Sequence, residues 1–223
     1  MNMKFSQHLR KFAHLIWEAN FNHPFVQGIG QGSLAEDKFI FFLRQDYVYL
    51  IEYCRFLSLI LAKGTTLEEM RKISEMVEAI LTFEMDFHRR VCADFGISAS
   101  ELEKTKPAPN NLGYTSYLLK VVYEGDIGDS MSALLPCLWG YNEIGLRLKE
   151  KGLPEHKHYQ DWILTYASNE FTALAGWCKN WVDDFAVNQK EDKLKRMQEI
   201  FLTNSRWEYL FWEMAWNKAD WAV

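Results

Sequence analysis

The sequence of 223 residues lacks several patterns that mark whole classes of protein. Its four cysteines, at positions 54, 92, 137 and 178, form no C-x-x-C pair, so their spacing does not indicate a zinc knuckle or a thioredoxin-type redox centre. It contains no block of five or six basic residues, and its formal net charge is −5. Nucleic-acid binding therefore has no electrostatic support, and we expect no nucleic-acid partner.

Long apolar runs are also missing. The longest stretch without a charged residue, from Ser130 to Asn142, is far too short to span a bilayer. The first eight residues are followed by charged residues rather than by the apolar core of a signal peptide. We therefore expect a cytoplasmic protein with no membrane partner and with reduced thiols. Because 48% of the residues are apolar, we expect residues 1–223 to form a single domain with one large core.

Apolar residues recur at helical spacing along almost the whole chain, and β-alternation is not evident, which predicts an all-α fold. Ser33, Thr66 and Ser98 are each followed three residues later by glutamate, the pattern of a capping box at a helix start. Residues 106–111 form the clearest loop, and Pro136 is expected to kink or restart its helix. The expected helices are one after residue 6, then about 33–63, 66–95, a short one after 98, 112–124, 129–150, 156–167, 169–188, 191–202 and 205–219.

Three reactive side chains fall on apolar helix stripes, where such groups are unusual. Asp46 lies between Leu43 and Leu50 at spacings of three and four residues. Glu208 precedes Phe211 and Trp212 at the same spacings, and Cys137 lies in a nearly uncharged segment. Carboxylates are almost never buried unless they are paired. We therefore expect an enclosed polar site in which pKa values are shifted for chemistry.

The chemistry of these residues favours a thiol and a carboxylate acting together. An aromatic, apolar face should raise the pKa of Glu208 and suit it to donate a proton near neutrality. None of the six histidines lies in a persuasive setting for a base beside Cys137; His88 shares a helix with Glu84 and is interpreted as a surface or core residue. The paired Glu-x-x-His spacing of a di-iron bundle is missing, so we expect no metal.

The chain closely resembles the TenA/thiaminase II family, the aminopyrimidine aminohydrolases of thiamin salvage, over nearly its whole length. The resemblance rests on an ordered set of short motifs, which are His23-Pro24-Phe25, Leu43-Arg44-Gln45-Asp46-Tyr47, Tyr114-Thr115-Ser116, Leu134-Leu135-Pro136-Cys137 with Tyr141 and Glu143, Trp162-x-x-x-Tyr166, and Glu208-Tyr209-x-Phe211-Trp212. It implies a heme-oxygenase-like helical bundle, a homotetramer and no cofactor. It also implies hydrolysis of 4-amino-5-aminomethyl-2-methylpyrimidine to the 5-hydroxymethyl pyrimidine and ammonia, and in many members cleavage of thiamin.

The resemblance also implies a role for each motif residue. Cys137 would be the nucleophile that adds to the pyrimidine ring, and Glu208 would protonate the leaving group and then help to activate water. Asp46 would hydrogen-bond the 4-amino group and a ring nitrogen. Tyr49 would tune the thiol, and three further tyrosines would orient the ring or stack on it, namely Tyr114, Tyr141 and Tyr166.

Two other functions stay open at this stage. The chain could be a pyrimidine-binding or regulatory protein without catalysis, or a redox relative on the same fold that uses two irons or handles quinone precursors. The sequence also leaves the preferred substrate undecided among the aminomethyl pyrimidine, its formylated relatives and thiamin, because all share one ring.

Overall fold

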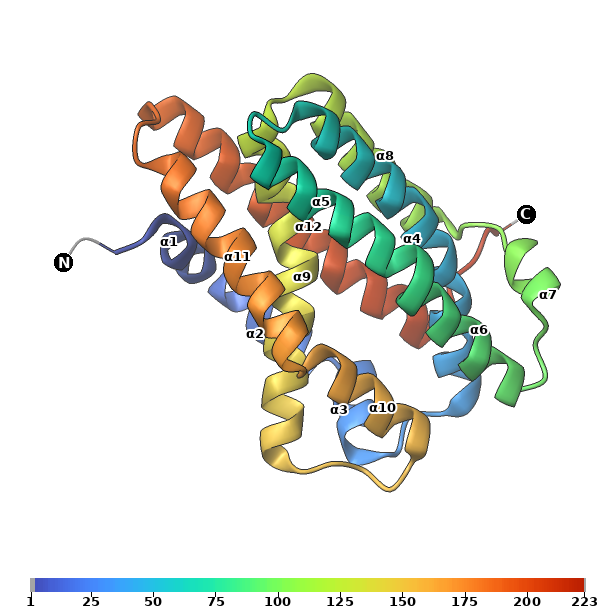
Figure 1. Ribbon diagram of the computed structural model, residues 1–223. Coiled ribbons are helices and arrows are strands. Elements are labelled where there is room, and N and C mark those ends of the chain that lie inside the picture. The colour runs from blue at the N-terminus through green and yellow to red at the C-terminus, as the bar shows by residue number, and fades with distance from the viewer. Residues whose placement is uncertain (1–2, 223) are drawn as a thin grey trace. The chain divides into compact units, whose positions relative to one another are not determined.

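The computed structural model describes residues 3–222, and every regular element within that range is a helix (Figure 1). The chain divides into two compact units. The first unit comprises residues 3–34 with Met131–Glu213, and the second unit comprises Ala35–Ser130 with residues 214–222. Within residues 3–222, no helix is both long enough and apolar enough to cross a membrane.

The second unit is built on the longest helix of the chain's first half. Helix α4 is amphipathic, and α5 and α8 lie alongside it (Figure 1). Its buried side includes several large apolar residues, among them Phe39, Phe42, Leu43, Leu50, Phe56 and Leu57. The helices of this unit are α4 (Glu36–Lys63), α5 (Leu67–Ala79), the π-helical turn η1 (Ile80–Glu84), α6 (Met85–Asp94), α7 (Ala99–Glu103) and α8 (Pro109–Glu124).

A buried amide network attaches the start of α8 to α4. Asn111 donates from Nδ2 to the Gln45 carbonyl oxygen at 2.7 Å and to its Oε1 at 3.0 Å. The Ala108 N–H also donates to Gln45 Oε1, at 2.9 Å, and Gln45 Nε2 donates to the Lys106 carbonyl at 3.0 Å. The predicted loop 106–111 is therefore shorter than expected, because Pro109 already occupies the first turn of α8, where a missing N–H costs nothing.

One extra residue shifts the register between α5 and α6. In η1 the Met85 N–H donates to the carbonyl of Ile80, five residues earlier. The buried positions accordingly jump from Ile80 to Met85 and continue at His88, whereas Phe83 is 78% exposed. The sequence predicts one uninterrupted helix over 66–95, and that prediction is wrong at this turn. A π-turn of this kind is rare and is often found at functional sites.

The first unit pairs helices that are far apart in the sequence. The Ser6 N–H and Oγ donate to the Asp183 carboxylate at 2.7 and 3.0 Å, which ties α1 to α11 (Figure 1). His23 caps α3, because its Nδ1 accepts from the Phe25 N–H at 3.1 Å. The helices of this unit are α1 (Phe5–Phe12), α2 (His14–Asn22), α3 (Pro24–Gln31), α10 (Lys157–Tyr166), α11 (Asn169–Ala186) and most of α9 (Ile127–Lys151) and α12 (Glu191–Asn217).

Most predicted helices are present, but three local expectations are wrong. The capping boxes at Thr66 and Ser98 are confirmed, whereas Ser33 caps nothing and α4 begins after Ala35. The expected break before Ser205 is absent, because its Oγ donates to the carbonyl of Phe201, four residues earlier, and α12 continues. Pro136 lies inside α9 without restarting it.

The close approach of α9 to the end of α10 provides a test of the first unit. A Cβ added at Gly145 would lie 2.9 Å from the backbone carbon of Tyr166 and 2.9 Å from the Ala167 nitrogen. Because backbone cannot move as a side chain can, we expect Gly145→Ala to lower the free energy of unfolding by about 1–3 kcal/mol. Gly176, inside α11, has no heavy atom within 4 Å of an added Cβ. We expect Gly176→Ala to be neutral or to stabilise by up to about 1 kcal/mol. Urea titration followed by circular dichroism measures both, and equal effects would contradict the packing argument.

Candidate active site

Asp46 is buried as its stripe predicts, and in the second unit it has a partner that the sequence analysis did not identify. Its side chain is only 5% exposed. His88 Nε2 lies 2.8 Å from Asp46 Oδ2, and His88 Nδ1 lies 2.8 Å from the Glu84 carbonyl oxygen. The imidazole therefore connects α6 to α4 and fixes the direction of the Asp46 carboxylate.

The hydrogen bonds of His88 indicate its protonation state. A carbonyl oxygen only accepts, so Nδ1 must carry a proton, and an ionised carboxylate only accepts as well. With Asp46 ionised, both ring nitrogens must donate and the imidazole must be charged. Burial alone lowers the pKa of His88, but the hydrogen bond and charge of Asp46 outweigh it, so that the pKa lies above its ordinary value. The buried pair is therefore an imidazolium and a carboxylate.

Glu84, at the end of the π-turn, is a second titrating group in this cluster. Burial, reinforced by the negative charge of Asp46, raises the pKa of Glu84 to about 7. Burial and the charge of Glu84 raise the pKa of Cys54 to about 11, and burial raises that of Cys92 to about 11. Both thiols are protonated at neutral pH, so they are structural rather than reactive.

Two of the predicted ring-binding tyrosines lie together in the second unit. The ring centroids of Tyr49 and Tyr114 are 5.2 Å apart, and Tyr49 also stacks on Tyr53 at 5.4 Å. Tyr49 follows Asp46 by one turn of α4, and Tyr114 is positioned by the amide network at the start of α8. The second unit thus presents a fixed carboxylate and an aromatic wall, which is the composition of a site for a planar polar ring.

The first unit places Glu208 beside a cluster of aromatic rings. Its side chain is 6% exposed, as its stripe predicts, and Trp212 follows one turn later on α12. Tyr141 lies 4.9 Å from Tyr166 and 5.1 Å from Trp212 between ring centroids, and Trp162 packs 4.7 Å from Tyr166. A carboxylate in such surroundings loses solvation, which favours its protonated form.

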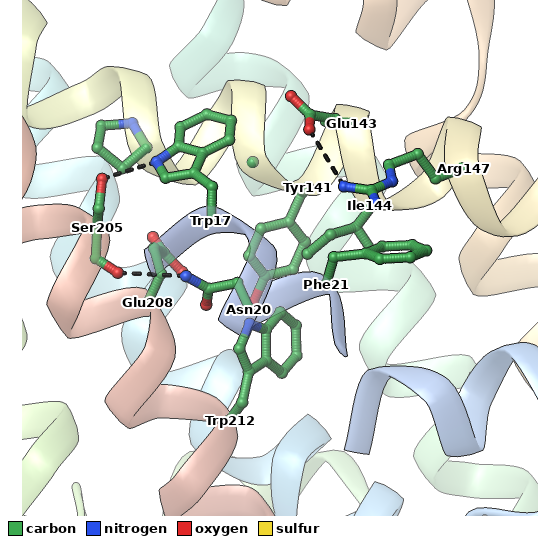
Figure 2. Close-up of a pocket in the computed structure, with 12 residues that line it drawn as sticks. Trp17, Asn20, Phe21, Tyr141, Glu143, Ile144, Arg147, Ser205, Glu208 and Trp212 are labelled. Carbon is green, nitrogen blue, oxygen red and sulfur yellow. Dashed lines mark hydrogen bonds and ion pairs between the residues drawn. The ribbon is translucent and has the colours of Figure 1, made fainter. Parts of the chain in front are cut away.

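Glu208 lines a small pocket in the first unit (Figure 2). Its cavity volume is about 20 Å³, which suits one water-sized molecule and not an aromatic ring. The lining residues are Trp17, Asn20, Phe21, Pro136, Gly140, Tyr141, Glu143, Ile144, Arg147, Ser205, Glu208 and Trp212.

The charged groups of this pocket neutralise one another. Glu143 pairs with Arg10 at 2.7 Å, and Arg147 pairs with Glu18 at 2.9 Å. Arg147 also stacks over the Phe21 ring, with its guanidinium carbon 3.6 Å from the centroid. Glu143 belongs to the motif set of the resemblance, and its position explains it as part of this ion-pair network.

Cys137 differs from the expectation that its thiol faces an interior, because the residue is half-buried, whereas Cys54, Cys92 and Cys178 are buried. One turn further along α9 stands Gly140, where an added Cβ would meet nothing within 4 Å. The glycine therefore leaves space beside the helix next to Cys137. Partial exposure is the condition under which a thiol can react.

The predicted site residues thus fall into two sets. Asp46, Tyr49 and Tyr114 belong to the second unit, and Cys137, Tyr141, Tyr166 and Glu208 belong to the first. His88 was missed because its partner lies 42 residues away in sequence, and its spacing to Glu84 was the only local signal. Among residues 3–222, no group of three or more His, Cys, Asp or Glu side chains is arranged to hold a metal ion.

The raised pKa of Glu84 generates a pH-dependent prediction. Between pH 4.5, the ordinary pKa, and about 7, the folded state keeps the Glu84 proton while the unfolded state loses it. The free energy of unfolding therefore falls as pH rises through this window. Glutamine has no proton to lose, so Glu84→Gln should be more stable than wild type above pH 7, by at most about 3 kcal/mol.

Urea titrations from pH 4 to pH 8 measure this difference, which should vanish at the acid end. Glu78→Gln, which alters an exposed glutamate shortly before the π-turn, is the matched control and should show no such trend. A constant difference across the pH range would contradict the burial of the Glu84 carboxyl group.

Comparison with known proteins gives the fold and the lineage. An aminopyrimidine aminohydrolase of Halalkalibacterium halodurans is 46% identical over 98% of this chain and 98% of its own length. The solved TenA homologue of P. horikoshii OT3 superimposes with a TM-score of 0.89 at 31% identity, covering 96% of this chain and 99% of that one. A domain of unknown function from Shewanella denitrificans with a heme oxygenase-like fold, 12% identical, superimposes with a TM-score of 0.73 over 95% of this chain and 91% of that one.

These similarities confirm the predicted all-α, heme-oxygenase-like fold. The TENA/THI-4/PQQC family matches residues 10–218, a range that includes residues of both units and all seven predicted site residues. The chain belongs to the TENA/THI-4/PQQC family.

Proposed function

We propose that this protein is an aminopyrimidine aminohydrolase of thiamin salvage. It converts 4-amino-5-aminomethyl-2-methylpyrimidine and water into the 5-hydroxymethyl pyrimidine and ammonia, and it also cleaves thiamin at the same methylene. The name of the 46% identical relative supports the substrate class. The observation that carries the chemistry is the burial of Glu208 beside Tyr141 and Trp212.

Cys137 supplies the nucleophile in this proposal. Its thiolate adds to the pyrimidine ring, which lets the group on the exocyclic methylene leave, and covalent addition divides one difficult step into easier ones. The half-buried position of Cys137 supports this role, since the buried thiols of Cys54 and Cys92 are protonated at neutral pH. Glu208 gives its proton to the departing amine or thiazole and then takes one from water, as suits a desolvated carboxyl group.

The ring is held by hydrogen bonding and stacking. The Asp46 carboxylate, oriented by His88, accepts from the 4-amino group and binds a ring nitrogen. Tyr49 tunes the thiol, and the remaining tyrosines orient or stack on the ring, namely Tyr114, Tyr141 and Tyr166. His88 is thus a positioning residue for Asp46.

Replacing the two central groups tests the function. We expect Glu208→Gln to lower kcat for ammonia release by roughly 10²–10⁴-fold, the range for a lost general acid, and Cys137→Ala to lower it at least as far. The matched control is Cys178→Ala, which removes a buried thiol of the first unit and should leave kcat unchanged. Helical circular dichroism confirms folding, and ammonia release is followed by a coupled assay. Retained turnover in Cys137→Ala would contradict the nucleophile.

We also propose that the protein is a cytoplasmic homotetramer. Several large apolar side chains are exposed on the single chain, among them Leu15 at 82%, Phe83 at 78% and Tyr123 at 70%, and burial in an interface would stabilise them. The four cysteines form no disulfide, which suits a reducing compartment. Light scattering on the eluting protein should give four times the chain mass, and a monomer at micromolar concentration would contradict this assembly.

A further inference from the structure

The amide of Asn20 has a buried acceptor atom with no hydrogen-bond partner. Asn20 lies on α2 and is 7% exposed. Its Nδ2 donates to the Ile16 carbonyl at 3.0 Å and to the Ser205 carbonyl at 3.4 Å. Because both partners are carbonyls, the nitrogen must face them. The oxygen Oδ1 is therefore the atom left over, and it is buried without a partner.

Asn20 lines the same small pocket as Glu208 (Figure 2). The neighbouring polar groups are already engaged. Ser205 Oγ accepts from Trp17 Nε1 at 2.9 Å and donates to the Phe201 carbonyl at 2.9 Å. Glu143 and Arg147 belong to the ion-pair network described above. A molecule in the pocket therefore finds Asn20 Oδ1 ready to accept a hydrogen bond.

The cavity volume of about 20 Å³ limits that molecule to the size of water or ammonia. The pyrimidine ring does not fit. The pocket lies against the Glu208 carboxyl group, with the aromatic rings of Trp17, Tyr141 and Trp212 around it. A water molecule there would donate one hydrogen to Asn20 Oδ1 and the other to the Glu208 carboxylate, which satisfies both of its donors.

We propose that this pocket holds the water consumed in the hydrolysis and that Asn20 is the positioning residue for it. This inference rests on the proposed function. A lone pair of the water oxygen forms the bond to the exocyclic methylene carbon, and the water proton passes to the Glu208 carboxylate, which has already given its own proton to the leaving group. The ring electrons then expel the Cys137 thiolate, so the C–S bond breaks and the alcohol is released.

A neighbouring asparagine provides a matched control. Asn204, on α12 in the same unit, is fully buried, donates from Nδ2 to the Ile200 carbonyl at 3.2 Å and also has an unpartnered Oδ1. It does not line the pocket. Asn20→Ala and Asn204→Ala thus remove the same buried amide, but only Asn20→Ala removes an acceptor from the pocket. Asn20→Leu removes the acceptor while keeping the volume.

The experiment measures the decay of the covalent Cys137 adduct by rapid quench and intact-protein mass, together with kcat and KM on the aminomethyl pyrimidine and on thiamin. Assays are run at a temperature where circular dichroism shows every variant folded. Both Asn20 variants should slow adduct decay about tenfold, the effect of one hydrogen bond, equally for the two substrates and with little change in KM. The adduct should accumulate, and Asn204→Ala should behave as wild type.

Two outcomes would overturn the inference. If the Asn20 variants slow adduct decay no more than Asn204→Ala does, the acceptor has no part in placing water. If they slow turnover of the aminomethyl pyrimidine alone, Asn20 acts on the departing amine, since thiamin loses a thiazole instead. A wild-type protein that turns over neither substrate contradicts the proposed function itself, and it is recognised because the wild type is then as inactive as the variants.

Discussion

The buried pair of Asp46 and His88 is the interaction on which the second unit depends. An unpaired carboxylate at this depth would cost several kcal/mol, and the imidazole removes that cost because its second nitrogen is already bound to the Glu84 carbonyl. The positions of α4, the π-turn and α6 are therefore linked by one ring. The same ring settles the charges of the cluster, with His88 positive, Asp46 negative and the raised pKa of Glu84 reflecting the anion beside it.

The first unit buries its carboxylate in a different way. Glu208 lies among aromatic rings, and the nearby cations Arg10 and Arg147 are bound to Glu18 and Glu143. No arginine is thus committed to Glu208 by these contacts, and the apolar surroundings favour a proton on its carboxyl group. An anion stabilised by an imidazolium suits binding of a polar ring, whereas a desolvated acid suits proton transfer. The two units differ in their electrostatics as the two proposed roles require.

Local signals predicted the fold well, and non-local contacts mark where sequence reasoning failed. Helical periodicity identified the helices and the burial of both carboxylates, because one face of each helix must be apolar. Capping boxes succeeded at Thr66 and Ser98 but not at Ser33, where the chain continues past Ala35 before turning. Ser205 reads equally as a helix start or as a side chain bonded to the preceding turn, and packing chose the second. His88 carried no local sign of its partner, since loop closure over 42 residues leaves no periodic trace.

The π-turn makes this stretch of the chain sensitive to its length. A regular α-helix advances by roughly 100° per residue, so removing one residue between Ile80 and Glu84 would convert the turn into ordinary helix and rotate everything after it by that amount. His88 would swing away from Asp46, and Met85 would leave the core. Substitutions within the exposed part of the turn are tolerable on this account, but insertions and deletions are not. Descent with a conserved residue count, rather than conserved side chains, is the evolutionary signature that such a turn should leave.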